Sequence, residues 1–262
     1  MLRLNKNNYF STKADNYYMS YSQFKSFSTC EARAMAELRC EYKQEKICFL
    51  EGHYLEALLN GTEESFLLEN PIMISSVGST KGQLKSNFLN VYKAYETLKR
   101  QPALMNTIKR CKPQKIVTGE IEGIPFKGCI DFIDLKTCNC CDIKCVKDFK
   151  RINSAEDKGY VNWYFAYRYH YQAAIYRELI RQKYGKIGSQ SIIAVTKENT
   201  PDVAAFTFFE GVLDDALEII KYFAREYNAI KQGEVEPKRC EECEYCKQTK
   251  SIVEFETIYE FE

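Results

Sequence analysis

The stretch KIVTGEIEGIPFKGCIDFIDLKTCNCCDIKCV, residues 115–146, decides the fold. It is rich in Ile, Val and Phe and is interrupted by Gly and Asn, a composition typical of strands joined by short turns. The pattern predicts three strands over residues 115–121, 124–134 and 140–146, with turns at residues 122–123 and 137–139. Because a short turn folds a strand back on its neighbour, we expect the end of the second strand to lie beside the start of the third.

The segments on either side have helical periodicity. Ser20 and, three residues later, Gln23 form a capping-box pattern, which predicts a helix over residues 21–39. The remaining pattern predicts helices over 46–60, 82–108, 161–184 and 211–232, and strands over 190–197 and 203–209. We expect one α/β domain over residues 1–262 with a mixed central sheet, divided into a helical N-terminal layer (18–110), a core (115–235) and a cysteine-rich tail (237–262).

The composition is that of a folded, soluble protein. Apolar residues make up 45% and charged residues 28% of the 262 residues, which argues against disorder. No apolar run approaches the roughly 18 residues of a membrane span, and MLRLNKNNYF, residues 1–10, lacks the apolar centre of a signal peptide. We therefore expect a cytoplasmic protein without a membrane partner, whose 12 cysteines are reduced thiols or metal ligands.

Asp142 and Lys144 form the first candidate site. Residues i and i+2 of a strand project to the same face, so the two side chains point together, and the predicted turn brings Asp131 alongside. Two neighbouring carboxylates repel each other unless a cation lies between them, and hard oxygen ligands suit Mg²⁺ or Mn²⁺. A lysine beside such a metal can orient the attacking water or help to deprotonate it. The arrangement predicts an apparatus for phosphodiester hydrolysis.

One carboxylate and one imidazole are further candidate metal ligands. Glu120 ends the strand that precedes Asp131, and His53 lies in LEGHYLEALL, residues 50–59. Either side chain can contact a metal directly, and Glu120 can also do so through water. A lone histidine is more often a hydrogen-bonded core residue than a metal ligand.

A helical stripe supplies the candidate substrate contacts. Tyr169, Gln172 and Tyr176 share one helix face by their i, i+3 and i+7 spacing, and Arg168 lies one turn before Gln172. Such a stripe can hold a DNA backbone and stack on a terminal base, whereas a purely structural tyrosine stripe would pack in the core. Gln172 stands out, because a buried amide needs hydrogen-bond partners.

These residues carry a resemblance to a known family. GCIDFID (128–134) followed by DIK (142–144) resembles the core motif of PD-(D/E)XK nucleases, and YRYHYQAAIY (167–176) is similar to the Gln-x-x-x-Tyr motif of their RecB-like and RecE-like branches. The segment around His53 resembles the upstream Gly-His helix, and MSYSQFKSFSTCEARA (19–34) resembles the Ser-rich opening helix. The resemblance covers roughly residues 18–235. The usual Pro before the first Asp is replaced by Ile130.

The resemblance implies a restriction-endonuclease-like core in a single nuclease domain. It further implies a Mg²⁺-dependent (or Mn²⁺-dependent) DNA exonuclease that acts on duplex ends, 5′→3′, in phage-type recombination with a single-strand annealing protein as partner. Because some members of the family form rings, a homo-oligomer of this protein is also conceivable. For the metal, the resemblance implies that Asp131 and Asp142 are ligands and that Glu120 and His53 assist them. It also implies that Lys144 assists hydrolysis and that Gln172 organises the site. The residues expected to contact the substrate end are Tyr176, Tyr169 and Arg168.

The tail is a second candidate metal centre. CEECEYC, residues 240–246, places Cys240, Cys243 and Cys246 at two successive C-x-x-C spacings, which suit Zn²⁺ or an iron–sulfur cluster given a fourth ligand. Some RecB-like nucleases hold a [4Fe–4S] cluster with one cysteine before the core and three after it, which makes Cys30 the candidate fourth ligand.

Three alternatives stay open. The tail cysteines can be free thiols, and a cluster there would favour an end-processing nuclease of the RecB-like type. A non-catalytic DNA-binding module with the same fold is the third alternative. The retained acidic residues and Lys144 argue against it, because buried carboxylates repel DNA.

Overall fold

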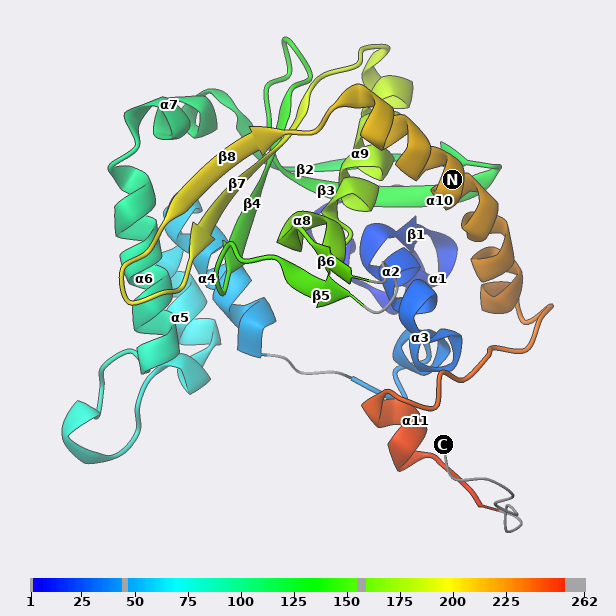
Figure 1. Ribbon diagram of the computed structural model, residues 1–262, viewed down its shortest axis with the longest axis horizontal. Coiled ribbons are helices and arrows are strands. Elements are labelled where there is room, and N and C mark those ends of the chain that lie inside the picture. Colours follow the sequence, from blue (N-terminus) through cyan, green and yellow to red (C-terminus); the bar gives the residue numbers. More distant parts are fainter. Residues whose placement is uncertain (1, 44–46, 155–158, 253–262) are drawn as a thin grey trace.

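A mixed β-sheet forms the centre of the computed structural model, which describes residues 2–43, 47–154 and 159–252. Within these residues the sheet has six strands in the order β1-β3-β4-β7-β8, with β2 paired to β3 (Figure 1). The strands are β1 (Met19–Ser20), β2 (Lys112–Ile121), β3 (Ile124–Ile133), β4 (Cys140–Val146), β7 (Gln190–Thr196) and β8 (Val203–Thr207). A separate hairpin consists of β5 (Ile152–Ser154) and β6 (Gly159–Val161).

Helices cover both faces of the sheet. Those of the N-terminal half are α1 (Thr12–Tyr17), α2 (Tyr21–Thr29), α3 (Glu31–Leu38), α4 (Ile47–Asn60), α5 (Glu63–Glu69), α6 (Ser86–Lys99) and α7 (Pro102–Arg110), with 3₁₀ turns at Pro71–Met73 and Gly78–Thr80. Those of the C-terminal half are α8 (Trp163–Ala166), α9 (Tyr169–Tyr184), α10 (Glu210–Gln232) and α11 (Glu244–Gln248).

The sheet separates two hydrophobic cores. One core lies between the sheet and α2, α3, α9 and α10, and the other lies between the sheet and α4, α6 and α7 (Figure 1). In β7, Ile192 and Ala194 face the first core while Ile193 and Val195 face the second, as the alternation of a strand requires. The layers α/β/α therefore follow from strands that are apolar on both faces.

Helix α9 is placed by the strand order. β4 and β7 are parallel neighbours, and parallel strands need a crossover connection. The chain makes this crossover through β5, β6, α8 and α9. The N-terminal turns of α9 consequently lie over β4, the strand that carries Asp142 and Lys144.

A glycine lets α9 approach the sheet closely. A Cβ atom on Gly128 of β3 would lie 2.7 Å from a ring carbon of Tyr176, closer than real Cβ contacts allow. Gly128 has no side chain, so the Tyr176 ring packs directly on the strand. This contact fixes the distance between the helix stripe and the strands that carry the acidic residues.

The sheet hairpins agree with the sequence prediction within three residues, whereas three predicted helices are interrupted. The helix predicted over 21–39 breaks at Cys30, whose φ of −165° is extended, and the one predicted over 82–108 begins at Ser86 and breaks before Pro102. The helix predicted over 161–184 breaks at Arg168, which has a left-handed φ of 60°. The predicted helix start at residue 46 and the tail beyond residue 252 lie outside the described residues.

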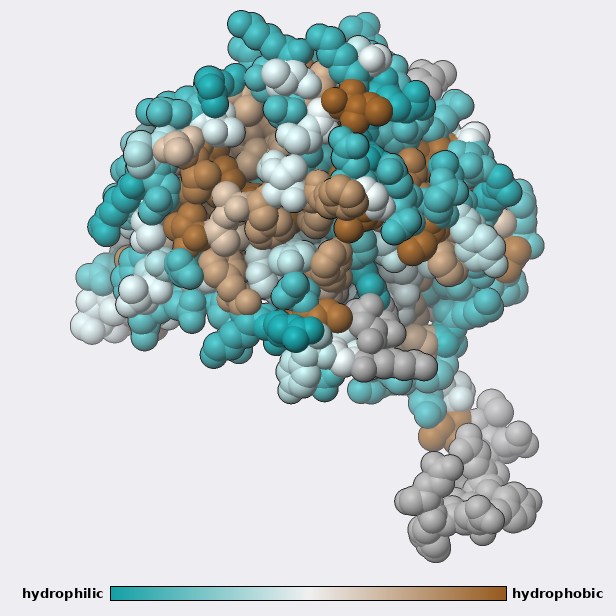
Figure 2. Space-filling model, turned by 45° about the horizontal axis from the view of Figure 1, so that its top comes forward, coloured by the Kyte–Doolittle hydropathy of each residue, from teal (hydrophilic) through white to brown (hydrophobic). Residues whose placement is uncertain are grey.

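No helix of the described chain is both long enough and apolar enough to cross a membrane. The face of the molecule in Figure 2 is hydrophilic over much of its rim, and hydrophobic residues gather toward its middle.

Candidate active site

Asp131 and Asp142 meet where the β3–β4 ladder ends. The strands pair at Phe132 with Cys141 and at Ile133 with Cys140, so the next step of the register sets Asp131 opposite Asp142. Instead of continuing the ladder, Asp131 Oδ2 accepts a hydrogen bond of 2.9 Å from the backbone N–H of Ile143. The buried Asp131 carboxylate is thereby fixed beside the strand segment that carries Asp142.

Lys144 contacts Asp142 directly. Its Nζ lies 2.5 Å from Asp142 Oδ2, and both side chains are mostly buried. The same Nζ lies 4.5 Å from the ring centroid of Tyr169, within the range of a cation–π contact. Burial alone would lower the pKa of Lys144, but the Asp142 carboxylate raises it above its ordinary value, so the side chain is a stable ammonium.

Gln172 bridges this pair from α9. Its Nε2 donates to Asp142 Oδ1 at 2.9 Å, and its Oε1 accepts from Lys144 Nζ at 3.1 Å. One amide thus serves a carboxylate and an ammonium together, which neither a glutamate nor an aliphatic residue can do. The odd polar residue of the sequence stripe has its partners in the candidate site.

The other members of the stripe lie around Gln172. The Tyr176 hydroxyl accepts a hydrogen bond of 3.2 Å from Gln172 Nε2, and its ring is buried against Gly128. Tyr169 lies beneath Lys144, and Arg168 is the left-handed residue at the start of α9, with its guanidinium 5.9 Å from the ring of Tyr171. Tyr176 and Tyr169 are therefore parts of the inner network.

Glu120 lies away from the cluster. In the β2–β3 register it pairs with Pro125 near the hairpin turn, whereas the position of β2 opposite Asp131 is Gln114. Six residues of strand, about 20 Å, separate the two positions. Its side chain is exposed, and its backbone is held by Gln182 of α9. The expectation that Glu120 joins the metal ligands is not met by this geometry.

Glu56, which the sequence analysis missed, is the carboxylate that lines the cavity together with Asp131. It lies one turn after His53 on α4, and its Oε2 accepts a hydrogen bond of 3.2 Å from Gln114 Nε2. Gln114 has a left-handed φ of 51° within β2, an uncommon conformation for a residue other than glycine. The sequence shows a carboxylate three residues after His53, but Glu51 lies two residues before His53 on the same helix, so the local pattern does not single out Glu56.

The carboxylates favour a cation between them. Burial, followed by the charges of Asp142 and Glu56, raises the pKa of Asp131 well above its ordinary value. Burial and the charge of Asp142 likewise raise the pKa of Glu56, against the effect of His53. Asp142 Oδ2 is buried, and its contact among the described residues is the ion pair with Lys144. Three acidic side chains, two of which have pKa values raised by neighbouring carboxylates, fit a divalent metal ion.

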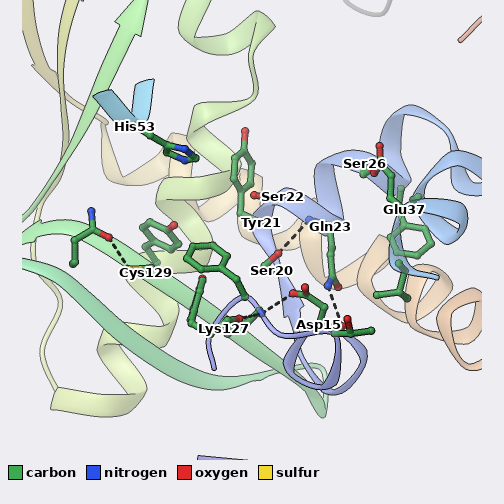
Figure 3. Close-up of a pocket in the computed structure, with 18 of the residues that line it drawn as sticks. Asp15, Ser20, Tyr21, Ser22, Gln23, Ser26, Glu37, His53, Lys127 and Cys129 are labelled. Atoms are coloured by element: carbon green, nitrogen blue, oxygen red, sulfur yellow. Dashed lines mark hydrogen bonds and ion pairs between the residues drawn. The ribbon is translucent and has the colours of Figure 1, made fainter. Parts of the chain in front are cut away.

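A cavity of about 400 Å³ opens beside these carboxylates (Figure 3). His53 lies at one end and Ser26 and Glu37 lie at the other (Figure 3), and Glu56 and Asp131 also line the cavity. Its walls between these ends carry hydroxyl, amide and aromatic side chains from α2 and the preceding segment: Tyr9, Ser20, Tyr21, Ser22 and Gln23. The lining mixes these polar groups with apolar side chains, and Asp131 and Glu56 of the acidic cluster belong to it.

Four cysteines meet at a second place. The Sγ atoms of Cys30, Cys240, Cys243 and Cys246 lie within 4.8 Å of one another, and Cys30 Sγ is 3.6 Å from Cys246 Sγ. None of them is in a disulfide. Backbone N–H groups of Cys243 and Cys246 donate to the sulfurs of Cys240 and Cys243, respectively. The fourth candidate, Cys30, is thus brought to the tail as expected, at the break between α2 and α3.

Comparisons with known proteins agree with this fold. The family model described as a PDDEXK-like domain of unknown function, DUF3799, matches residues 20–249. A crystal structure of a candidate exonuclease from Eubacterium rectale superimposes with a TM-score of 0.91 at 27% identity, over 98% of this chain and 97% of that one. The structure of SSO0001 aligns with a TM-score of only 0.29 at 12% identity, over 86% of this chain and 91% of its own. No curated protein matches the sequence.

The family match spans most of the chain, and the sheet of the matching region carries the Asp131, Asp142 and Lys144 cluster. The restriction-endonuclease-like α/β core expected from the sequence is confirmed. The chain belongs to the PDDEXK-like domain family DUF3799 and, through it, to the PD-(D/E)XK nuclease superfamily.

Proposed function

We propose that the protein is a Mg²⁺-dependent deoxyribonuclease that removes nucleotides from the ends of duplex DNA. The observation that carries the proposal is a group of three carboxylates: Asp131 and Glu56 line one cavity, Asp142 lies opposite Asp131 on the neighbouring strand, and Lys144 is held against Asp142. The similar structure from Eubacterium rectale, a candidate exonuclease, supports activity at ends.

Asp131, Asp142 and Glu56 would hold the divalent ion, with His53 beside them. When bound, such an ion polarises the phosphoryl oxygen and makes water a better nucleophile at neutral pH. Gln114 fixes the Glu56 carboxylate, and the N–H of Ile143 fixes that of Asp131. The protein thereby presents carboxylate oxygens whose orientation is set before the ion arrives.

Lys144 orients the attacking water and stabilises the charge that develops on the phosphate. Its ammonium is held by three partners, Asp142, Gln172 and the Tyr169 ring, so its position needs little rearrangement during the reaction. Gln172 keeps the Asp142 and Lys144 side chains in register. Tyr176 fixes Gln172 in turn, through its hydroxyl.

The finer features of the proposal rest on the resemblance described for the sequence. They are 5′→3′ polarity, a role in phage-type recombination and a single-strand annealing protein as partner. The cavity beside Asp131 would receive the nucleotide at the strand end, since the hydroxyl and amide groups in its lining are common partners of phosphate and sugar oxygens.

The proposal is tested with end-labelled linear duplex DNA and covalently closed circular duplex DNA, each with Mg²⁺ or with EDTA. We expect linear DNA to be consumed only with Mg²⁺, while closed circles survive. Efficient nicking of the circles would make the protein an endonuclease. Failure to degrade any DNA with Mg²⁺ or Mn²⁺ would contradict the proposal as a whole.

Two single variants test which glutamate completes the metal site: Glu56, which the structure indicates, or Glu120, which the sequence pattern predicted. Glu56→Gln removes a charge from the acidic cluster, and we expect cleavage of linear DNA to fall by about 100-fold. Glu120→Gln makes the same chemical change on an exposed strand end, and its rate should match the unmodified protein. The reverse pattern in initial rates would return Glu120 to the metal site.

The four-cysteine cluster is proposed as a structural Zn²⁺ site. Zn–S bonds of about 2.3 Å at tetrahedral angles place sulfurs roughly 3.8 Å apart. The sulfur distances of 3.6 Å (Cys30 to Cys246) and 4.0 Å (Cys240 to Cys246) agree with this spacing. In a [4Fe–4S] cluster each thiolate binds a different iron, which requires more widely separated sulfurs. The ion would join the tail to the start of α3.

Metal analysis of the purified protein should find about one zinc per chain and no iron. Cys246→Ser should lose the zinc and lower the free energy of unfolding by at least about 2 kcal/mol, because metal binding contributes directly to folding. Cys40→Ser, at an exposed cysteine outside the cluster, is the matched control and should keep the zinc. A brown protein with absorbance near about 400 nm and bound iron would overturn the zinc assignment.

A further inference from the structure

An open groove of about 810 Å³ lies along β2. Its walls come from the N-terminal segment 2–6, from residues 112–118 of β2, and from Lys183 near the end of α9. Gln114 lines both this groove and the catalytic cavity, so the two share one wall. The groove therefore begins beside the acidic cluster.

The charge of the groove is strongly one-sided. Five of the described lining residues are basic and none is acidic: Arg3, Lys6, Lys112, Lys115 and Lys183. The whole chain is close to neutral, with 37 basic and 36 acidic residues, so this local excess is not a consequence of composition. Among the described residues, none of the five pairs with a carboxylate in a salt bridge. Such a surface attracts a polyanion.

Lysines on an edge strand often serve only to prevent edge-to-edge pairing of sheets. That explanation applies to Lys112 and Lys115, which lie on β2, a strand paired on one side only. It does not apply to Arg3, Lys6 and Lys183, which reach the groove from two other segments. Burial and the charge of Lys115 lower the pKa of Lys183, which indicates that these ammonium groups repel each other.

The length of the groove suits a nucleic acid. Residues 112–118 of β2 extend over about 20 Å, and DNA advances by about 3.4 Å per nucleotide along its axis, so the lysines can follow several consecutive phosphates. We propose that this basic groove binds the phosphodiester backbone of the DNA next to the end that is being cleaved. This inference rests on the proposed function, since it assigns the path of its substrate.

The test uses two double variants that change net charge equally. Lys112→Glu/Lys183→Glu reverses two exposed groove residues, and Lys81→Glu/Lys93→Glu reverses two exposed residues at α6 and the turn before it. Binding of fluorescent 20-mer duplex and single-stranded DNA is measured in EDTA over a range of salt concentrations. Digestion of linear duplex by the unmodified protein with Mg²⁺ is measured in parallel.

We expect the groove variant to bind DNA at least about tenfold more weakly at 0.1 M salt. Its binding should also depend less on salt, with the magnitude of the slope of log K against log salt smaller by about 2. The control variant should bind like the unmodified protein. A larger loss for duplex than for single strand assigns the groove to the duplex, and the opposite assigns it to one strand. If both variants bind DNA equally and the unmodified protein digests DNA normally, the groove is not a DNA-binding site, while the proposed nuclease activity stands. No binding and no digestion by the unmodified protein would reject the proposed function itself.

Discussion

Asp142→Asn is expected to abolish DNA cleavage with Mg²⁺ while leaving the fold intact. The asparagine has the same shape and keeps a carbonyl oxygen for Gln172 Nε2, but it loses the charge that holds the cation. Metal catalysis supplies several kcal/mol of transition-state stabilisation, and each 1.4 kcal/mol is about tenfold in rate. We therefore expect a loss of about 1000-fold or more in the initial rate on linear duplex.

The matched control is Asp215→Asn, which makes the same exchange at an exposed position of α10. Its cleavage rate should be unchanged. Thermal unfolding of both variants shows whether any loss comes from the fold. Near-normal cleavage by Asp142→Asn would remove Asp142 from the metal site.

The second large effect is expected at Lys144. Lys144→Ala removes the ammonium that contacts Asp142, Gln172 and the Tyr169 ring, and the loss of one positioned group that stabilises transition-state charge typically costs about 100-fold to 1000-fold in rate. Lys144→Arg keeps the charge, but its planar fork is larger than the compact ammonium and cannot take the same position among Asp142, Gln172 and the Tyr169 ring. We expect both variants to lose most of the cleavage rate and still to bind DNA ends.

Lys81→Ala, at an exposed lysine of the turn before α6, is the control and should cleave normally. Cleavage rate and the dissociation constant for a duplex end are measured on the same preparations. If DNA binding falls in step with the rate, Lys144 grips the substrate. If Lys144→Arg is fully active, its role is limited to charge neutralisation of Asp142.

The hairpin from β2 to β4 was predictable from sequence because its signals are local. Period-two alternation, the turn at 122–123 and the Asp-x-Lys spacing each depend on neighbouring residues only. Gln172 was also found, because an amide among apolar and aromatic residues of a helix needs partners, and the structure places those partners on β4.

Glu56 and Gln114 could not be found in the same way. Glu56 reaches the cluster because α4 packs against β4, and Gln114 does so because it lies opposite Asp131 in the β2–β3 register. Glu120 seemed suitable because it ends a strand, but the register puts that end beside the hairpin turn. Contacts between distant segments, rather than local pattern, decide which of several carboxylates share a site.

The helix interruptions have a similar origin. Cys30 interrupts a helical pattern where its sulfur meets those of the tail, about 210 residues later in the chain. Arg168 adopts a left-handed conformation where α8 ends and α9 begins, which turns α9 onto β4. Local helix propensity is overridden at both positions by tertiary placement, so continuous periodicity overestimated helix length.

The central claim is that Asp131, Asp142 and Glu56 hold a catalytic divalent ion. Crystals grown with Mn²⁺ test it directly, since anomalous scattering locates the ion without assumptions about the reaction. We predict an anomalous peak in contact with carboxylate oxygens of all three residues, and its absence in crystals of Asp142→Asn. Well-ordered carboxylates with no peak between them, while Mn²⁺ occupies other positions, would contradict the account.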